Sequence, residues 1–446
     1  MLCCAGCGGR QIEVSAGSGT DAGGASDAGT IEVKARLSAG CAVVANVDVA
    51  CPGALTVTID YGETPAYGMK TPAYPVDGDG HVSVPLLGLT KEKLNHFRVT
   101  AASASGGAIV SKDYLIAGGT LPAKFPRFVV KKRTGPADGY LVMGITDAWG
   151  AEAKAVIVSR EGRLMWYRVM EKMTPHGLQV ERLPNGHIAV YMGEDAGFDE
   201  VDISGTTLHT WSDTVAERGT NGHEFRMLAG GNALLLGFGG YTGSDNFDYI
   251  DEIDATGAGH FHWAGPAMPS ENDVYHANSL DPIPDGAVLL SLRNTSEVLK
   301  IDMATGKTIW TLGGDTSDFT FVNDPLKGSS QQHHVRRLPN GNITMFDNGV
   351  MRNTPESRAV EYRLDEAART ATLVWENRHD PAVFCPIAGS VQRLDNGNTI
   401  VCWGASKLDT GALSITEVDP AGDVVWEMQS PGWGAYRAQW VPELYP

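Results

Sequence analysis

Four histidines stand at matching positions upstream of a turn that recurs along the chain. His176, His223, His276 and His333 lie seven, five, seven and five residues before the residue that precedes the Pro of this turn, or its Ala in the second copy. All four offsets are odd, and alternate residues of a β-strand share one face. If these segments are extended and carry no bulge, the four imidazoles therefore point in the same direction.

Histidines gathered on one face suit two kinds of chemistry. Imidazole is a common ligand of Zn, Cu and Fe, and it is also a nucleophile and a general acid or base near neutral pH. Arg293 lies in the same repeat as His276, and a guanidinium is a poor neighbour for a metal ion but a good one for an anion. A single histidine is more often an ordinary packed residue, whereas four in register favour a site. We therefore expect a site that holds an anion, with no metal.

The recurring turn predicts β-hairpins. Most of its five copies carry Asn-Gly or Asp-Gly between alternating apolar residues, which is the strongest short signal of a type I′ hairpin turn. The copies occupy residues 182–190, 227–236, 282–292, 337–346 and 393–403. A second hairpin follows each copy and ends in an apolar strand with Trp, at 208–213, 259–265, 306–314, 371–378 and 422–429. Two hairpins make a four-stranded blade, and a repeat of 40 to 57 residues made of short strands indicates a propeller.

A sixth copy of the Trp hairpin at 155–169 precedes the first turn. We therefore expect an all-β protein whose residues 121–446 form a six-bladed β-propeller, with blades that begin near 128, 176, 223, 276, 333 and 388. The tail at 436–445 is expected to complete the first blade and close the ring, which removes free sheet edges. If the histidine strand is the innermost strand of each blade, the imidazoles converge on the central channel. Gly389 takes the equivalent place in the sixth blade.

The overall composition restricts the partners of this chain. Its 446 residues include 35 Lys and Arg against 53 Asp and Glu, a net charge of −18. This excess of negative charge opposes binding to nucleic-acid phosphates or to an anionic membrane. No apolar run approaches the ~20 residues that a membrane-spanning helix needs. The composition therefore excludes a multi-pass membrane protein and disfavours a nucleic-acid partner.

Residues 1–30 differ from the rest of the chain. Three cysteines fall in the first seven positions, and a tract of Gly, Ala, Ser and Asp follows. Such a tract has too few apolar side chains to form a core, so we expect a flexible tether. The segment 2–7 resembles the end of a bacterial lipoprotein signal, in which small residues precede the lipidated cysteine, here Cys7. We expect an exported protein, a periplasmic or cell-envelope lipoprotein, that touches the membrane only through this anchor.

Residues 31–120 predict a small β-sandwich. Apolar and polar residues alternate there in short runs broken by Gly and Pro, a period of two that is typical of strands with one buried face. The pattern at 87–99 resembles a corner and strand of a fibronectin type III module. We expect this domain to pack against the larger domain or to orient it.

Two cysteine pairs could form disulfides in an exported protein. Cys41 and Cys51 are expected to close a short loop, and in a reducing compartment they would be small buried side chains. Cys385 and Cys402 lie seventeen residues apart in the last blade. For this second pair, a bridge and two buried thiols are equal alternatives.

Several strings resemble the bacterial arylsulfotransferases. They include GHEFRML at 222–228, YHANSLD at 275–281, QQHHVRRLPNGNITMFDNG at 331–349 and GSVQRLDNGNTIVCWG at 389–404. The resemblance covers the whole expected propeller. It implies an enzyme that moves a sulfuryl group from a phenolic sulfate ester to a phenol, without a cofactor or a nucleotide sulfate donor. It also implies a six-bladed propeller behind an N-terminal β-sandwich.

The resemblance assigns roles to the residues found by spacing. His333 would be the nucleophile that is transiently sulfated. His223 and His276 would support it, and Arg293 would hold the sulfuryl oxygens. His334 has the opposite parity and is expected to face the other way.

Three further residues are expected to bind substrate. Asn278 is a polar lining residue, His176 lies at the channel rim, and Tyr275 offers a ring for stacking. The string GKT at 306–308 is not a phosphate-binding loop, because Ile301 stands where the first Gly is needed.

Two other functions remain as alternatives. One is a non-catalytic propeller that binds partners at the cell surface, and the other is a metal-dependent lyase or hydrolase on the same scaffold. The registered histidines together with Arg293 disfavour the first, because a binding scaffold needs no set of titratable groups in its channel. Stoichiometric Zn, Cu or Fe on these histidines would support the second.

Overall fold

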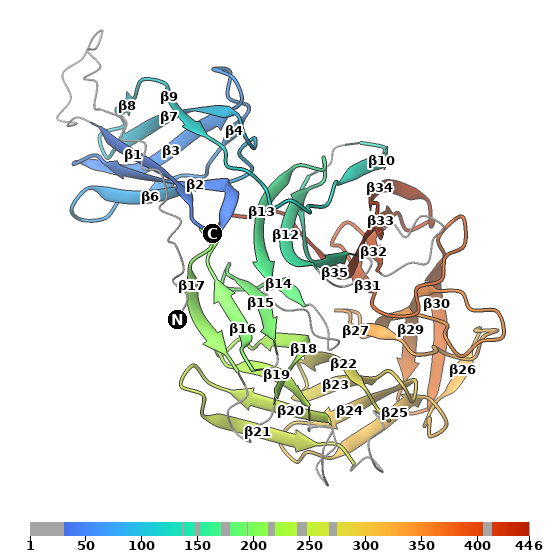
Figure 1. Cartoon of the computed structure of the whole chain (residues 1–446). Coiled ribbons are helices and arrows are strands. Elements are labelled where there is room, and N and C mark those ends of the chain that lie inside the picture. Colours follow the sequence, from blue (N-terminus) through green and yellow to red (C-terminus); the bar gives the residue numbers. More distant parts are fainter. Residues whose placement is uncertain are drawn as a thin grey trace, which may run out of the picture.

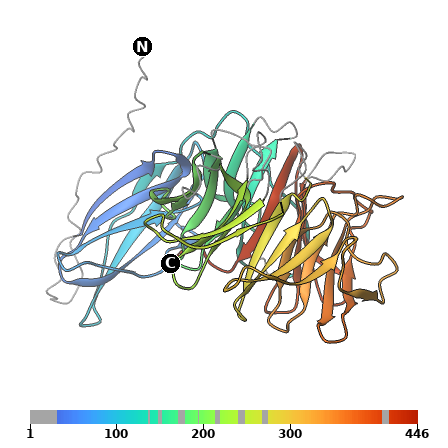
Figure 2. The same ribbon diagram turned by 90° about the horizontal axis from the view of Figure 1, so that it is seen from below.

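The computed structural model describes residues 31–135, 138–147, 152–170, 179–193, 195–212, 219–238, 248–266, 274–404 and 413–445. All regular structure in these ranges is β-strand, which confirms the all-β prediction. Within them the chain forms no helix that could cross a membrane. Two groups of sheets lie side by side, one built from the N-terminal strands and one from the rest (Figures 1 and 2).

The N-terminal group consists of two antiparallel sheets that share one core. The first has the order β1-β2-β6, with β1 (Glu32–Ser38), β2 (Cys41–Ala50) and β6 (His81–Leu86). The second contains β4 (Met69–Lys70), β3 (Ala54–Gly62), β7 (Leu94–Ser103) and β8 (Ala108–Val110), with β5 (Tyr74–Pro75) paired to β3 and β9 (Tyr114–Ala117) to β7. Alternate residues of both sheets, such as Val47, Val57 and Phe97, are fully buried between them. The period-two pattern of the sequence thus predicted the buried face of each sheet.

The predicted bridge between Cys41 and Cys51 is wrong. All four cysteines among the described residues are free and buried. Cys41 begins the ten-residue strand β2 and Cys51 follows its end, so they are about 30 Å apart at 3.3 Å per residue. A disulfide needs Cα atoms within about 7 Å. Cys41 instead accepts a hydrogen bond from the backbone N–H of Tyr167 at 3.2 Å, in the contact between the two groups of sheets.

The remaining strands form six sheets. Four of them follow one another along the chain, each in sequence order from its first strand. They are β14 (Val180–Arg182), β15 (Ile188–Gly193), β16 (Gly197–Val201) and β17 (Thr207–Trp211); β18 (Gly219–Met227), β19 (Ala233–Phe238), β20 (Asp248–Ile253) and β21 (Gly259–Ala264); β22 (Ala277–Ile283), β23 (Ala287–Leu292), β24 (Glu297–Asp302) and β25 (Thr308–Gly313); and β27 (His333–Arg337), β28 (Ile343–Asp347), β29 (Arg358–Asp365) and β30 (Thr370–Asn377), with β26 (Thr320–Val322) parallel to β30.

The last two sheets join distant parts of the chain. One contains β31 (Ser390–Arg393), β32 (Thr399–Trp403), β33 (Leu413–Val418) and β34 (Val424–Ser430), with β10 (Val129–Arg133) paired to β34. The other contains β35 (Trp433–Val441), β11 (Tyr140–Asp147), β12 (Ala153–Ser159) and β13 (Leu164–Met170). The C-terminal strand β35 pairs with β11, as predicted for the tail. The segment near 128 does not begin the first sheet, because it forms β10 at the outer edge of the last one.

The six sheets surround a common centre, so this part of the molecule is propeller-like (Figure 1). Their first strands face one another there: β18 contacts β22, β22 contacts β27, β27 contacts β31, and β35 contacts both β31 and β14. The predicted Trp segments form the fourth strands β17, β21, β25, β30 and β34. The turn signatures connect each first strand to the second. This arrangement brings residues from distant repeats to the centre.

Asparagines of the turn signatures fix the hairpins. An amide of the turn donates to a glutamate on the third strand of the same sheet in four pairs: Asn185–Glu200 at 2.8 Å, Asn232–Glu252 at 2.7 Å, Asn342–Glu361 at 2.6 Å and Asn398–Glu417 at 2.6 Å. Glu361 also pairs with Arg393 of the next sheet at 2.6 Å.

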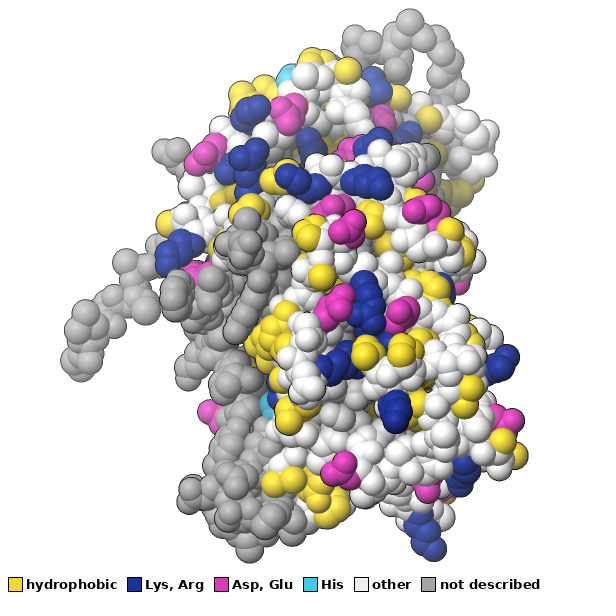
Figure 3. Space-filling model, turned by 90° about the vertical axis from the view of Figure 1, so that its right-hand side faces the viewer, with side chains coloured by type: hydrophobic (Ala, Val, Ile, Leu, Met, Phe, Trp, Pro, Cys, Tyr) yellow, Lys and Arg dark blue, Asp and Glu magenta, His cyan; other side chains and the backbone are white. Residues whose placement is uncertain are grey.

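On the face shown in Figure 3, acidic and basic side chains are interspersed among apolar ones.

Candidate active site

Three of the predicted histidines meet around one tyrosine. His223 lies in β18, His276 directly precedes β22, and His333 begins β27. The ring centroids of His223 and His276 are 4.8 Å apart. Tyr436 of β35 makes edge contacts with His223 at 5.5 Å and with His333 at 6.3 Å between ring centroids. Four sheets therefore bring these rings together at the centre of the molecule.

His333 is almost completely buried, with 2% of its surface exposed. Its Nδ1 lies 2.8 Å from Oδ1 of Asn348, and its Nε2 lies 3.3 Å from the backbone N of Ala388. Burial holds the pKa of His333 well below its usual 6.5, and the positive charge of Arg293 lowers this pKa further. The contact with Asn348 offsets only part of this effect. His333 is therefore a neutral imidazole at pH 7.

The other two histidines differ in their surroundings. His223 is 3% exposed, and its Nδ1 lies 2.5 Å from Oδ1 of Asn221. His276 is half-buried and has a left-handed backbone, with φ of 53°. Its carbonyl accepts a hydrogen bond from the backbone N–H of Arg293 at 3.0 Å. This bond joins the segment before β22 to the segment after β23 and places the backbone of Arg293 beside that of His276.

The Arg293 side chain reaches across to the loop before β31. Its Nη1 donates to Oδ1 of Asn294 at 2.6 Å and its Nη2 donates to the carbonyl of Pro386 at 3.1 Å. The same loop contains Ala388, whose N–H faces His333. Arg293 thus places a permanent positive charge near a neutral nucleophile, which suits an anionic substrate.

Asn278 lies fully buried in β22. Its Nδ2 donates to the carbonyl of Gln332, the residue before His333, at 2.8 Å. The backbone carbonyl of Asn278 accepts hydrogen bonds from the Tyr436 hydroxyl at 3.2 Å and from Arg437 at 2.6 Å. Burial raises the pKa of Tyr436 to about 12, so this hydroxyl keeps its proton at neutral pH. Asn278 therefore connects β22, β27 and β35 around the histidines.

Of the two remaining predicted binding residues, the structure describes only Tyr275. Tyr275 packs on the apolar core between the sheet of β18 and the sheet of β22, and its carbonyl accepts from the N–H of Asn294 at 3.0 Å. His176 lies outside the described residues. Within the described part of the chain, the histidine cluster therefore consists of His223, His276 and His333.

The predicted strand register assumed regular strands, and this assumption does not hold. The strands β18, β22 and β27 each contain a register shift close to the histidine. His334 also has a positive φ of 53°. As a result His334 does not face away from the centre, and it lines a central cavity of about 320 Å³ with residues of β14, β18, β31 and β35.

This central cavity is rich in arginines. Arg226, Arg336 and Arg437 line it together with His334. The buried Glu224 accepts from Arg336 with both oxygens at 3.0 Å and from Arg437 at 2.8 Å. Burial lowers the pKa of His334, and the charges of Arg336 and Arg437 lower it further. Arg226 in turn pairs with Glu181 at 2.7 Å, so carboxylates balance much of the positive charge of this cavity.

Three residues that contact the site were not predicted from the sequence. Asn348 and Ala388 touch the two ring nitrogens of His333, and Arg437 links the histidine cluster to the central cavity. The string FDNG at 346–349, which follows the fourth turn signature, is the signal that could have pointed to Asn348. Within the described residues no three His, Cys, Asp or Glu side chains are grouped so that they could hold a metal ion.

Three imidazoles, an arginine and a tyrosine thus gather at the centre of the propeller-like part, an arrangement that suits an anionic group. The family model described as Arylsulfotransferase (ASST) matches residues 127–437, which is more than half of the chain. The chain belongs to the arylsulfotransferase family and is an arylsulfotransferase enzyme.

Solved structures show likeness in fold alone. A protein of unknown function from Bacteroides caccae has 18% identity and a TM-score of 0.50, over 69% of this chain and 100% of that one. A catalytically inactive virginiamycin B lyase from Staphylococcus aureus has 8% identity and a TM-score of 0.40, over 69% of this chain and 99% of that one. Among the curated proteins, none matches this chain.

Proposed function

We propose that this arylsulfotransferase moves a sulfuryl group from a phenolic sulfate ester to a phenol through a sulfated His333, without a nucleotide donor. The observation that carries the proposal is the convergence of His223, His276 and His333 around Tyr436, with Arg293 close to His333. We also propose that the six sheets are the blades of a closed six-bladed propeller, and that the N-terminal sheets form a fibronectin III-like sandwich.

The first half of the reaction sulfates His333. A ring nitrogen of His333 donates its lone pair to sulfur, the bond from sulfur to the aryl oxygen breaks, and the phenolate leaves with that electron pair. A neutral imidazole is required, and burial together with Arg293 keeps His333 neutral at pH 7. The leaving phenolate belongs to a phenol of pKa about 10, so a protonated His223 or His276 assists it as general acid.

The second half reverses these steps with the acceptor phenol. The histidine that protonated the leaving group is now a base and removes the acceptor's proton, and the acceptor oxygen attacks sulfur as the N–S bond breaks. Sulfuryl transfer, like phosphoryl transfer, needs alignment and cations around the equatorial oxygens. Arg293 supplies such a cation near His333, and the buried Oδ1 of Asn278, which has no hydrogen-bond partner among the described residues, is a candidate acceptor for a substrate hydroxyl.

The GKT string at 306–308 does not form a nucleotide-binding loop in this fold. The Gly306–Thr308 string lies at the turn between β24 and β25, and Lys307 is exposed there. A phosphate-binding loop would instead wrap around the phosphates in front of a helix. We also propose that the protein is an exported lipoprotein anchored at Cys7, which lies outside the described residues.

The activity test uses a chromogenic aryl sulfate with phenol as acceptor and no nucleotide. We expect phenol-dependent release of the chromophore, abolished in His333→Asn and retained in His260→Asn. His260 is a surface histidine that contacts Asp254, which makes it a matched control. No turnover over a broad donor panel, or an active His333→Asn variant, would refute the proposal. Stoichiometric Zn, Cu or Fe in the purified protein would favour the metal-dependent alternative.

A further inference from the structure

We propose that Asn348 is the positioning residue of His333: it holds the imidazole as the Nδ1–H tautomer, so that Nε2 carries the lone pair that attacks sulfur. This inference rests on the proposed function for its chemistry. The tautomer itself follows from contacts on both sides of the ring.

The orientation of the Asn348 amide fixes the proton on Nδ1. Asn348 is fully buried directly after β28. Its Nδ2 donates to the carbonyls of Cys385 at 2.7 Å and Ala388 at 2.9 Å. Carbonyl oxygens only accept, so both protons of the amide nitrogen are used there. The amide oxygen is therefore the atom that lies 2.8 Å from Nδ1 of His333, and Nδ1 must carry the proton.

The contact of the other ring nitrogen, Nε2, indicates the tautomer of His333 independently. The backbone N of Ala388 lies 3.3 Å from Nε2 of His333. A backbone N–H only donates, so Nε2 must present its lone pair. Ala388 has a φ of 62°, which is unusual for a residue with a side chain. The contact is long, so an incoming sulfur can replace it at small cost. Both contacts assign the same tautomer.

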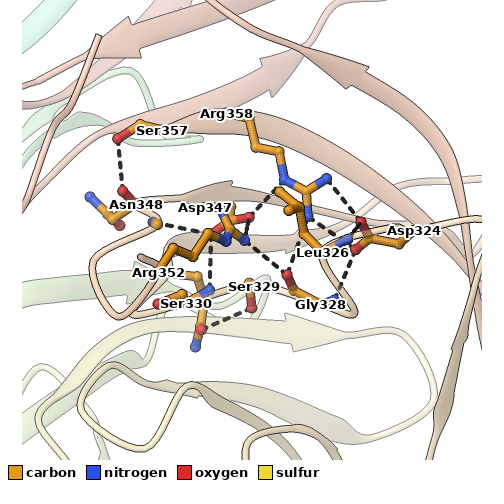
Figure 4. Close-up of polar contacts among 12 residues, drawn as sticks. Asp324, Leu326, Gly328, Ser329, Ser330, Asp347, Asn348, Arg352, Ser357 and Arg358 are labelled. Atoms are coloured by element: carbon orange, nitrogen blue, oxygen red, sulfur yellow. Dashed lines mark hydrogen bonds and ion pairs between the residues drawn. The ribbon is translucent and has the colours of Figure 1, made fainter. Parts of the chain in front are cut away.

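A buried frame holds Asn348 in place (Figure 4). The hydroxyl of Ser357 donates to the carbonyl of Asn348 at 2.9 Å. The preceding residue, Asp347, accepts from Nε of Arg358 at 2.8 Å and from the backbone N–H of Ser330 at 2.9 Å. The chain on either side of the amide is therefore anchored to β29 and to the segment that leads into His333.

This arrangement keeps the covalent intermediate reactive. When Nε2 bonds to sulfur and the aryl oxygen leaves with its electron pair, Nδ1 keeps its proton and the ring becomes a sulfated imidazolium. The amide oxygen of Asn348 accepts from Nδ1–H but brings no negative charge. The ring thus stays cationic and leaves readily when the acceptor attacks sulfur. The N–H of Ala388, released by Nε2, is then available to a sulfuryl oxygen.

The first test reads the tautomer without any activity. Protein with ¹⁵N-labelled histidine is studied by long-range ¹H–¹⁵N correlation at pH 7, and His333→Asn assigns the signal. We expect a neutral ring with its proton on Nδ1. A proton on Nε2 would overturn the inference, whatever the enzyme catalyses. Absence of sulfuryl transfer would instead refute the proposed function and leave the tautomer result standing.

The second test compares Asn348→Ala with Asn342→Ala. Asn342 belongs to the hairpin of β27 and β28 and also donates a hydrogen bond, to Glu361, but lies outside the histidine cluster. We expect Asn348→Ala to slow the release of the first phenol about 10-fold to 100-fold, as loss of a hydrogen-bond partner does for metal-bound histidines. The donor KM should change little, and the His333 signal should lose its single tautomer. An Asn348→Ala variant with an unchanged tautomer or with the rate of Asn342→Ala would overturn the inference.

Discussion

Replacement of Arg358 by Met is expected to destabilise the propeller-like part strongly. The Arg358 side chain is fully buried and binds the carboxylates of Asp347 at 2.8 Å and Asp324 at 3.0 Å (Figure 4). It also binds the carboxylate of Glu376 at 2.7 Å. Met fills a similar volume but leaves the fully buried carboxylate of Asp324 without its cation, whereas Asp347 keeps its ion pair with Arg352. Loss of one partner of a buried ion network costs about 3–5 kcal/mol.

The pKa of Asp324 supports this magnitude. Burial raises the pKa of Asp324, but hydrogen bonds from Arg358, Tyr362 and the backbone of Gly328 outweigh burial and lower the pKa from 3.8 to about 2. At 1.36 kcal/mol per pKa unit this difference stabilises the fold by about 2.4 kcal/mol. Arg358 supplies part of this stabilisation and adds its bonds to Asp347 and Glu376, so a total of about 3–5 kcal/mol is consistent.

The pH dependence gives the prediction its sign. In the wild type the contribution of Asp324 is fully present above its unfolded pKa of 3.8 and is lost as the pH falls toward about 2. In Arg358→Met the unpaired carboxylate of Asp324 takes up a proton at higher pH, because burial disfavours its charged form. The stability deficit of the variant should therefore be largest at pH 7 and shrink as the pH falls toward 4.

Urea unfolding followed by Trp fluorescence at pH 7 and pH 4.5 measures the free energy of unfolding of both proteins. Arg363→Met is the control, because Arg363 lies exposed on the same strand, and it should change stability by less than about 0.5 kcal/mol. A deficit below 1 kcal/mol for Arg358→Met, or a deficit that grows on acidification, would refute the reasoning.

Three further predictions concern pH, thiols and the closing strand. Burial and Arg293 hold the pKa of His333 below 6.5. In single-turnover kinetics, the rate of the donor half-reaction should therefore fall on acidification with a midpoint below pH 6.5. A midpoint at or above 6.5 would contradict this. Cys41 and Cys51 should resist alkylation in the native protein and become labelled as free thiols after denaturation, as peptide mapping will show; a peptide cross-linked between them would be a contrary result. Deletion of residues 433–446 removes β35 from the sheet of β11 and should leave a chain that is digested rapidly in limited proteolysis, whereas wild-type resistance would show that β35 is dispensable.

Much of the fold could be predicted because local signals repeat. The Asn-Gly and Asp-Gly turns marked the hairpins, but the predicted type I′ turn is wrong. Positive φ occurs at the glycines Gly186, Gly286, Gly341 and Gly397 and not at the Asn or Asp before them, whereas a type I′ turn needs it at both positions. The Trp strands recur at similar intervals and became the fourth strand of each sheet. The first segment lacked a turn signature, so nothing local showed that the strand near 128 joins the last sheet. Cys41 and Cys51 are close in sequence but lie at opposite ends of one strand, which a spacing argument misses.

The site was only partly predictable for the same reason. His223, His276 and His333 carry a signal in their register, although bulges in all three strands changed how the rings meet. Asn348 lies in the same repeat as His333, but the other contacts come from distant repeats: Ala388 lies 55 positions away, and the Tyr436 hydroxyl bonds to a carbonyl 158 positions away. Contacts of this kind depend on tertiary structure, and no local pattern in a single sequence encodes them.

Direct detection of the covalent intermediate tests the central claim. The protein is incubated with an aryl sulfate and no acceptor, quenched under alkaline conditions, digested and mapped by mass spectrometry. We expect one equivalent of released phenol and a sulfuryl group on the peptide that contains His333, absent in His333→Asn and removed when phenol is added. A sulfuryl group on another residue, or turnover with no sulfated enzyme in single-turnover conditions, would contradict it.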